Sequence, residues 1–148
     1  MYDSTNASAI PRTAEVVAGY IDGKYAWSPA AWSAFPNSVH VAIAVFASTN
    51  DGEVLDCETG DATPAECPAW IRLRQAHGLA IPTIYCNKSS LLLVQQYCAG
   101  LTYDVWLADY TGVPHIPAGM AACQYDDQPA RTGGDYDLSL CQPYWPRD

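Results

Sequence analysis

Hydrophobic positions along this chain come in short runs that are rich in β-branched residues and are separated by turn residues. Each run has the length and composition of a buried strand rather than of a helix. The pattern therefore predicts strands at 16–21, 40–46, 53–58, 82–86, 104–108, 120–125 and 136–140.

Three segments between the early strands have helical spacing and recognisable start signals. Ser28 before Pro29 is typical of a helix start. Thr63 and Glu66 form a capping box for a second helix, which we expect to end near residue 78. A third helix is expected over 89–100.

The later connections, 111–119 and 126–135, are rich in Pro and Gly and are predicted to be loops. An open sheet needs helices on both faces, whereas a closed barrel hides one face of every strand without them. We therefore predict an α/β fold: a small TIM-like barrel of about seven to eight mostly parallel strands, with helices after the early strands and few after the late ones. The 148 residues suffice for one such domain, over 1–148.

Charge and composition narrow the possible partners. Sixteen acidic and seven basic side chains give a net charge of -9, which repels nucleic acid and anionic lipid. No run of about 18 apolar residues is present for a membrane span, and the first residues, MYDSTNASAIP, lack the pattern of a secretory signal. The six cysteines do not have the spacing of zinc ribbons or redox motifs.

Acidic residues recur where the predicted strands end, at Asp22, Asp56, Glu58, Asp109 and Asp126. In a parallel barrel these ends lie on one face, where ligands and catalytic groups collect. Acids at strand ends also cap the following helix or accept from nearby N–H groups, so their placement alone leaves both interpretations open.

Asp56 and Glu58 give the sharpest signal because strand residues two apart point to the same side. Their backbones are expected about 6 to 7 Å apart. This spacing suits a carboxyl pair that shares acid and base roles across a glycosidic bond, because burial beside a like charge raises one of the two pKa values.

Seven motifs, in order, resemble the glycoside hydrolase family 25 lysozymes, also called Chalaropsis-type muramidases. They are YIDGKYAW, HVAIAVFAS, VLDCETGD, PTIYCN, VWLADY, ACQYD and GGDYDLSL. The resemblance implies a barrel of five strand–helix units followed by three strands almost without helices. It also implies that Glu58 is the general acid and that Asp56 acts as a stabilising anion or orients the N-acetyl group of the substrate.

By the same resemblance, Asp22 and Asp137 complete the carboxylate ring. The expected substrate-binding residues are Tyr85, Trp106, Asp109, Gln124 and Tyr125. Two departures stand out. One strand–helix unit before the D-x-E strand is missing, and the last motif reads D-L-S where the family has D-x-N, so that Asp135 competes with Asp137.

The sequence thus leads us to expect a hydrolase that cleaves β-1,4 bonds of peptidoglycan or a related polysaccharide, without a cofactor. We expect it outside the cell or at the cell wall, as a secreted enzyme or a phage endolysin module. The alternative is a catalytically inactive barrel that binds cell-wall glycan or serves on a virion surface. A divalent cation held by the carboxylates remains an option. Local cysteine pairs 57–67, 86–98 and 123–141 are geometrically plausible, although free buried thiols are an equal alternative.

Overall fold

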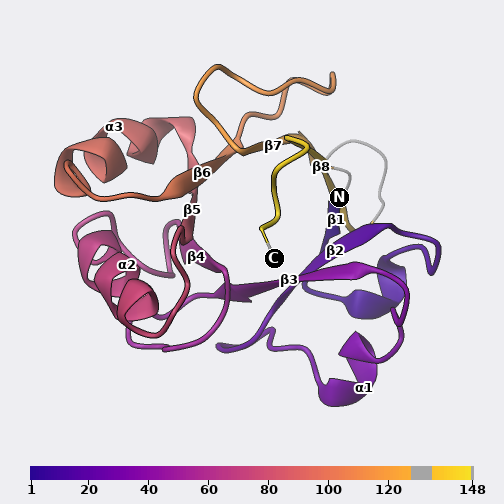
Figure 1. Cartoon of the computed structure of the whole chain (residues 1–148). Coiled ribbons are helices and arrows are strands. Elements are labelled where there is room, and N and C mark those ends of the chain that lie inside the picture. The colour runs from indigo at the N-terminus through magenta and orange to yellow at the C-terminus, as the bar shows by residue number, and fades with distance from the viewer. Residues whose placement is uncertain (128–134, 148) are drawn as a thin grey trace.

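The computed structural model describes residues 1–127 and 135–147, and it shows a closed barrel of eight strands that neighbour one another in sequence order (Figure 1). All neighbouring strands from the first to the seventh are parallel, and the eighth is antiparallel to both of its neighbours. The strands are β1 (Tyr2–Asp3), β2 (Val16–Tyr20), β3 (Val39–Ala44), β4 (Val54–Cys57), β5 (Thr83–Asn87), β6 (Asp104–Ala108), β7 (Ala122–Asp127) and β8 (Asp137–Cys141).

The barrel confirms the seven predicted strands to within a few residues and adds β1, which the pattern did not predict. Only two residues form β1, so the strand is too short to show the two-residue alternation of apolar and polar positions. Tyr2 of β1 pairs with Val17 on one side and with Leu138 on the other, and this double pairing closes the barrel.

Helices cover only part of the barrel. They are a short 3-10 helix η1 (Ala7–Ala9), α1 (Pro29–Trp32), α2 (Cys67–Ala76) and α3 (Lys88–Tyr97). In Figure 1, α2 and α3 lie together beside β4, β5 and β6, and α1 lies elsewhere on the circumference. Among the described residues, α-helices follow β2, β4 and β5 only, so the regular strand–helix alternation of a TIM-like barrel is not confirmed. Most of the second predicted loop, at 128–134, lies outside the described residues.

The first helix starts at its predicted signal, whereas the N-cap of the second is Glu66, three residues after the predicted N-cap, Thr63. The Ser28 side chain accepts from the N–H of Ala31, 3.2 Å away. The Glu66 carboxylate accepts from the Thr63 N–H at 2.8 Å, as a capping box requires, but the Thr63 hydroxyl donates to the same carboxylate at 2.6 Å. The helix itself begins at Cys67, which places Pro68 in the first turn, where it removes no hydrogen bond.

Strand alternation divides the core into an interior and an outer layer. On β4, Val54 belongs to the cluster inside the barrel, and Leu55 and Cys57 belong to the layer under α2 and α3. On β2, a Cβ at Gly19 would come within 2.5 Å of the Trp27 ring, so only glycine allows this ring to cover the strand.

All six cysteines are free thiols, five of them buried and Cys141 half-buried. The expected pair 123–141 is wrong because Ala122, not Cys123, lies opposite Cys141, so the two side chains point to opposite faces of the barrel wall. The pair 86–98 is also absent, since both thiols are free, and the Cys98 thiol interacts with that of Cys67 instead. The Cys57 and Cys67 thiols do lie in contact, without a bond between them.

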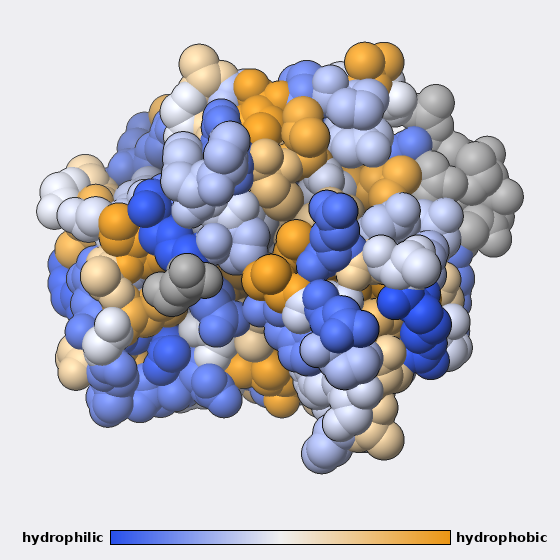
Figure 2. Space-filling model, turned by 45° about the vertical axis from the view of Figure 1, so that its right-hand side comes forward, coloured by the Kyte–Doolittle hydropathy of each residue, from blue (hydrophilic) through white to orange (hydrophobic). Residues whose placement is uncertain are grey.

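On the face shown in Figure 2, hydrophilic residues are interrupted by small apolar groups. None of the helices in the described part of the chain has the length and apolar character needed to cross a membrane.

Candidate active site at the barrel mouth

The carboxyl ends of the parallel strands surround a pocket of about 90 Å³. It is lined by side chains from all eight strands and from two residues that follow strands, Glu58 after β4 and Tyr110 after β6. The lining residues are Asp3, Tyr20, Ile43, Asp56, Glu58, Tyr85, Trp106, Tyr110, Gln124 and Asp137. Four of the ten are acidic and none is basic.

β4 supplies the pair that the D-x-E spacing predicted. Asp56 points into the barrel and is 4% exposed, and its Oδ1 atom has no hydrogen-bond partner. Glu58 follows the strand directly, is half-buried and hydrogen-bonds the Asn87 side chain at the end of β5. The prediction that both acids face one pocket is confirmed by their shared lining of it.

A second acidic pair, Asp3 and Asp137, is bridged by Gln124. The Gln124 Nε2 donates to Asp3 Oδ2 at 2.8 Å and to Asp137 Oδ2 at 3.2 Å. Its Oε1 accepts from the hydroxyls of Tyr85 at 2.6 Å and Tyr110 at 2.8 Å. The Gln124 amide therefore makes two donor and two acceptor hydrogen bonds, and it fixes the positions of two carboxyls and two phenols.

Burial changes the ionisation of these acids. Burial, with Asp137 as the next contribution, raises the pKa of Asp3 to about 8. Burial, followed by the charge of Glu58, raises the pKa of Asp56 to about 8. Burial also raises the pKa of Glu58, although its hydrogen bond to Asn87 opposes the rise. The mouth therefore retains protons at neutral pH, as an acid–base site needs.

Asp22 has a structural task that its placement did not reveal. Its Oδ1 accepts from the Val45 N–H at 2.7 Å, and its other oxygen accepts from the Thr49 hydroxyl. Asp22 lies outside the mouth pocket and lines an adjacent one, which also contains Asp56 and Glu58. The four acids of the expected ring are therefore not all in one pocket.

The other expected site residues divide in the same way. Tyr85, Trp106 and Gln124 line the mouth pocket, whereas Tyr125 and Asp109 do not. Tyr125 lies at a register shift in the pairing of β7 with β8. The Asp109 carboxylate is 2.7 Å from Lys88 Nζ and 3.1 Å from His115 Nε2.

Sequence reasoning missed Asp3 and gave Asp137 a competitor. Asp3 ends the first strand, but its two-residue strand left the acid without a recognisable run before it. Asp135 is exposed and accepts from Asn6 Nδ2 at 2.9 Å, so Asp137 rather than Asp135 occupies the pocket. The sequence offers one signal for Asp3. This acid follows two apolar residues and precedes the turn residues Ser4, Thr5 and Asn6, as an acid at the end of a short strand would.

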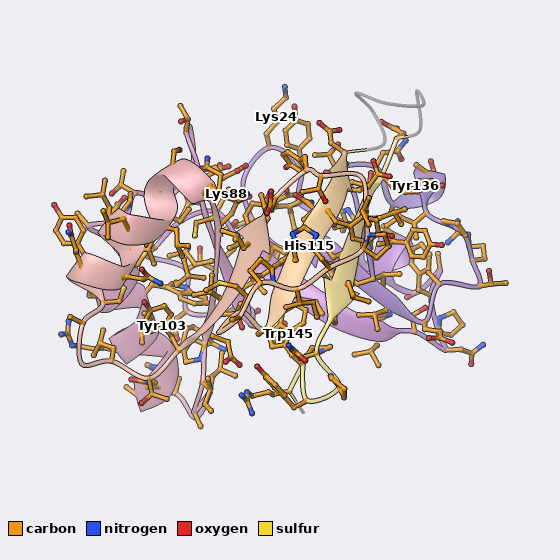
Figure 3. All side chains as sticks on the ribbon, turned by 90° about the horizontal axis from the view of Figure 1, so that it is seen from above. Lys24, Lys88, Tyr103, His115, Tyr136 and Trp145 are labelled. Atoms are coloured by element: carbon orange, nitrogen blue, oxygen red, sulfur yellow. The ribbon has the colours of Figure 1, made fainter. Side chains whose placement is uncertain are left out.

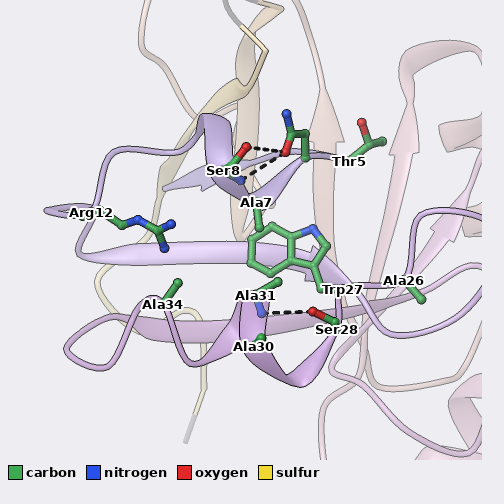
Figure 4. A pocket seen from close by; sticks show the side chains of 11 residues that line it. Thr5, Ala7, Ser8, Arg12, Ala26, Trp27, Ser28, Ala30, Ala31 and Ala34 are labelled. Atoms are coloured by element: carbon green, nitrogen blue, oxygen red, sulfur yellow. Dashed lines mark hydrogen bonds between the residues drawn. The ribbon is translucent and has the colours of Figure 1, made fainter.

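A larger groove of about 500 Å³ lies outside the barrel, between the η1 segment and α1 (Figure 4). Its lining includes five alanines and a single charged side chain, Arg12. The Trp27 ring lines the base of this groove, and its indole N–H donates to the Ser4 carbonyl at 3.0 Å. The groove offers no pair of titratable groups for catalysis.

No group of three His, Cys, Asp or Glu side chains in the described part of the chain could hold a metal ion. Comparison with protein families, with curated proteins and with solved structures finds no match to this chain.

Proposed function

We propose that the barrel is a hydrolase of cell-wall glycan that cleaves β-1,4 glycosidic bonds of peptidoglycan at the mouth pocket. The observation that carries the proposal is the pair of Asp56 and Glu58, which line the mouth pocket with raised pKa values and with no basic side chain in its lining. The order of motifs that resembles the family 25 lysozymes supports the same substrate class and a small TIM-like arrangement.

In the proposed reaction, Glu58 protonates the oxygen of the leaving sugar as the bond from that oxygen to the anomeric carbon breaks. Asp56 stabilises the positive charge that develops at the anomeric carbon, either directly or by orienting the N-acetyl group. The two carboxyls titrate as a coupled pair. Burial favours a proton on Asp56 at neutral pH, and the reactive form is the one in which the proton lies on Glu58 and the charge on Asp56. Water then adds to the anomeric carbon and returns the proton to the pair.

The bridge of Asp3, Gln124 and Asp137 supports this pair from across the pocket. It holds hydrogen-bond acceptors and the Tyr85 and Tyr110 hydroxyls at fixed positions, which suits recognition of sugar hydroxyls. Gln124 is 2% exposed, so we assign it as a positioning residue rather than a catalytic one.

Exposed aromatic rings at the mouth fit the proposal because sugar rings present apolar C–H faces. Tyr110 is 49% exposed and lines the mouth pocket, and Tyr25 is 47% exposed and lines the adjacent one. The two rings mark the direction in which a glycan chain can extend from the cleavage point. Such a substrate places the protein outside the cell or at the cell wall.

The proposal is tested by the release of reducing ends from purified peptidoglycan. Glu58→Gln keeps the size and removes the proton donor, so we expect the rate to fall about 10²- to 10⁴-fold, the range of a lost general acid. Glu15→Gln is the matched control because Glu15 is exposed and precedes β2 at the opposite end of the barrel. Equal rates for wild type and Glu58→Gln would overturn the assigned role.

The glycan-binding alternative gives a different result in the same assay. Wild type would then be retained on purified cell wall and release no reducing ends. Both outcomes are measured on one preparation, so the assay separates catalysis from binding.

A further inference from the structure

A second pocket of about 190 Å³ opens beside the mouth pocket and shares Tyr20, Asp56 and Glu58 with it. Its remaining lining comes from the segments after β1, β2, β3 and β4. These residues are Thr5, Asp22, Lys24, Tyr25, Val45 and Asp61. The Asp56–Glu58 pair therefore borders both pockets, and a glycan chain cleaved at this pair passes beside the second pocket.

The side pocket carries a strong excess of negative groups. Asp22, Asp56, Glu58 and Asp61 line it, against Lys24 alone. The Lys24 ammonium lies 4.9 Å from the centre of the Tyr25 ring, and no ion pair joins it to these carboxylates among the described residues. Within 1–127 and 135–147, these carboxylates thus have no cationic partner.

Among the described residues, the Asp56 carboxyl has an unsatisfied oxygen atom. Its side chain is 4% exposed, and its Oδ1 has no hydrogen-bond partner although the atom is buried. An orphaned buried acceptor destabilises the folded protein, because its loss of hydration is not offset by a hydrogen bond. A ligand that donates hydrogen bonds at this position removes the cost.

The acidic lining of the side pocket favours one kind of ligand over others. Within the described residues, no three acidic, His or Cys side chains are grouped closely enough for a metal ion. Burial and the neighbouring Asp22 raise the pKa of Asp61, and Asp61 in turn contributes to the raised pKa values of Asp56 and Glu58. Neutral hydroxyls do not relieve such repulsion between carboxylates. A single ammonium group relieves it and supplies three donors.

We propose that the side pocket binds the ammonium group of an amino sugar that lacks its N-acetyl group, so that the barrel prefers partly de-N-acetylated cell-wall glycan. This inference rests on the proposed function for its substrate and adds the specificity. Asp61 is the specificity residue, because it lines the side pocket and not the mouth pocket, and no hydrogen bond of its carboxylate occurs among the described residues.

The test compares one glycan in three forms: acetylated peptidoglycan glycan, the same material after partial de-N-acetylation, and that material acetylated again. We expect faster cleavage of the de-N-acetylated form by about two- to fivefold, the range of a partly exposed ion pair. The advantage disappears on re-acetylation. Equal or slower cleavage of the de-N-acetylated form overturns the inference but leaves the proposed function intact.

Two variants test whether the preference for de-N-acetylated glycan comes from the side pocket. Asp61→Asn removes a charge from the pocket and is expected to lower the rate ratio of the two glycans towards one. Asp51→Asn is the control with the same charge change. Asp51 lies before β4, at the opposite end of the barrel, and its amide can still accept from the Gly52 N–H. A ratio that is unchanged in Asp61→Asn overturns the assignment.

If neither glycan is cleaved, the proposed function fails, and binding still decides the inference. Calorimetric titration of wild type with the acetylated and de-N-acetylated forms then gives the two affinities. Tighter binding of the de-N-acetylated form supports the inference, and equal or weaker binding overturns it.

Discussion

The two ends of the barrel differ in the groups that they bury. One end buries an aromatic ring whose polar atom is hydrogen-bonded, and the other buries carboxyls. At the amino ends of the strands, Trp145 closes the barrel with 5% of its surface exposed. Its indole N–H donates to the Thr83 hydroxyl at 2.9 Å, and its ring packs 5.9 Å from that of Trp106. We call this end the floor. Figure 3 shows Trp145 and Tyr103 towards this end and Lys24 towards the other.

At the mouth, by contrast, the buried groups are carboxyls and their hydrogen bonding is incomplete. Asp3 and Asp56 each keep one buried oxygen without a partner. The floor therefore stabilises the folded state, whereas the unsatisfied polar groups at the mouth lower the free energy of unfolding. A cost concentrated at one pocket, on a barrel closed at its other end, is the pattern expected of a binding or catalytic site.

Removal of the floor should have the largest effect on stability. Trp145→Ala deletes a buried aromatic ring and opens the interior, so we expect the free energy of unfolding to fall by about 3–5 kcal/mol. Urea denaturation measures the change. Tyr144→Ala is the matched control because Tyr144 is 50% exposed, and a loss of similar size in that variant would contradict the role of the floor.

Removal of an acid at the mouth should instead stabilise the protein. The pKa of Asp3 is about 8 in the folded state, against an ordinary value of 3.8. Between these pH values the folded state holds a proton that the unfolded state has lost. The free energy of unfolding therefore falls as the pH rises from about 4 to about 8, by up to about 1.4 kcal/mol per pH unit.

Asp3→Asn is expected to flatten this fall and to raise the melting temperature at pH 8, because the Asn side-chain oxygen can still accept from Gln124. Thermal melts at several pH values provide the measurement. Asp51→Asn should leave the slope of the wild type in place. An unchanged slope in Asp3→Asn would show that Asp3 titrates normally.

A smaller effect is expected from the hydrogen bond at the floor. Thr83→Val keeps the shape but leaves the Trp145 indole N–H buried without an acceptor, at a cost of about 1–3 kcal/mol. Thr102→Val, at an exposed position, is the control. No difference between the two variants would mean that the indole finds another acceptor.

The smallest effect is expected at the rim of the mouth. Tyr110→Phe removes one of two phenols that donate to Gln124, while the Tyr85 hydroxyl remains 2.6 Å from the same oxygen. We expect a stability loss near 1 kcal/mol or less and a larger loss in Tyr85→Phe, since Tyr85 is only 6% exposed. The reverse order, measured by denaturation, would contradict the assignment of Tyr85 as the inner partner.

The sequence by itself determined the features that depend on near neighbours in the chain. The strand runs follow from β-branched composition, and the shared orientation of Asp56 and Glu58 follows from the two-residue period of a strand. The signals for helix starts at Ser28 and Glu66 are equally local. These features were predictable because the backbone geometry that produces them spans only a few residues.

Only the tertiary structure decided which distant groups meet. Asp3 and Asp137 come together because β1 pairs with β8, and Asp22 is drawn away because the Val45 amide lies within its reach. Cys141 faces inward and Cys123 outward through the register of β7 with β8. Trp145 reaches the floor from the far end of the chain. Closure of the barrel sets all of these contacts, and it depends on pairing between residues more than a hundred positions apart, which no local pattern specifies.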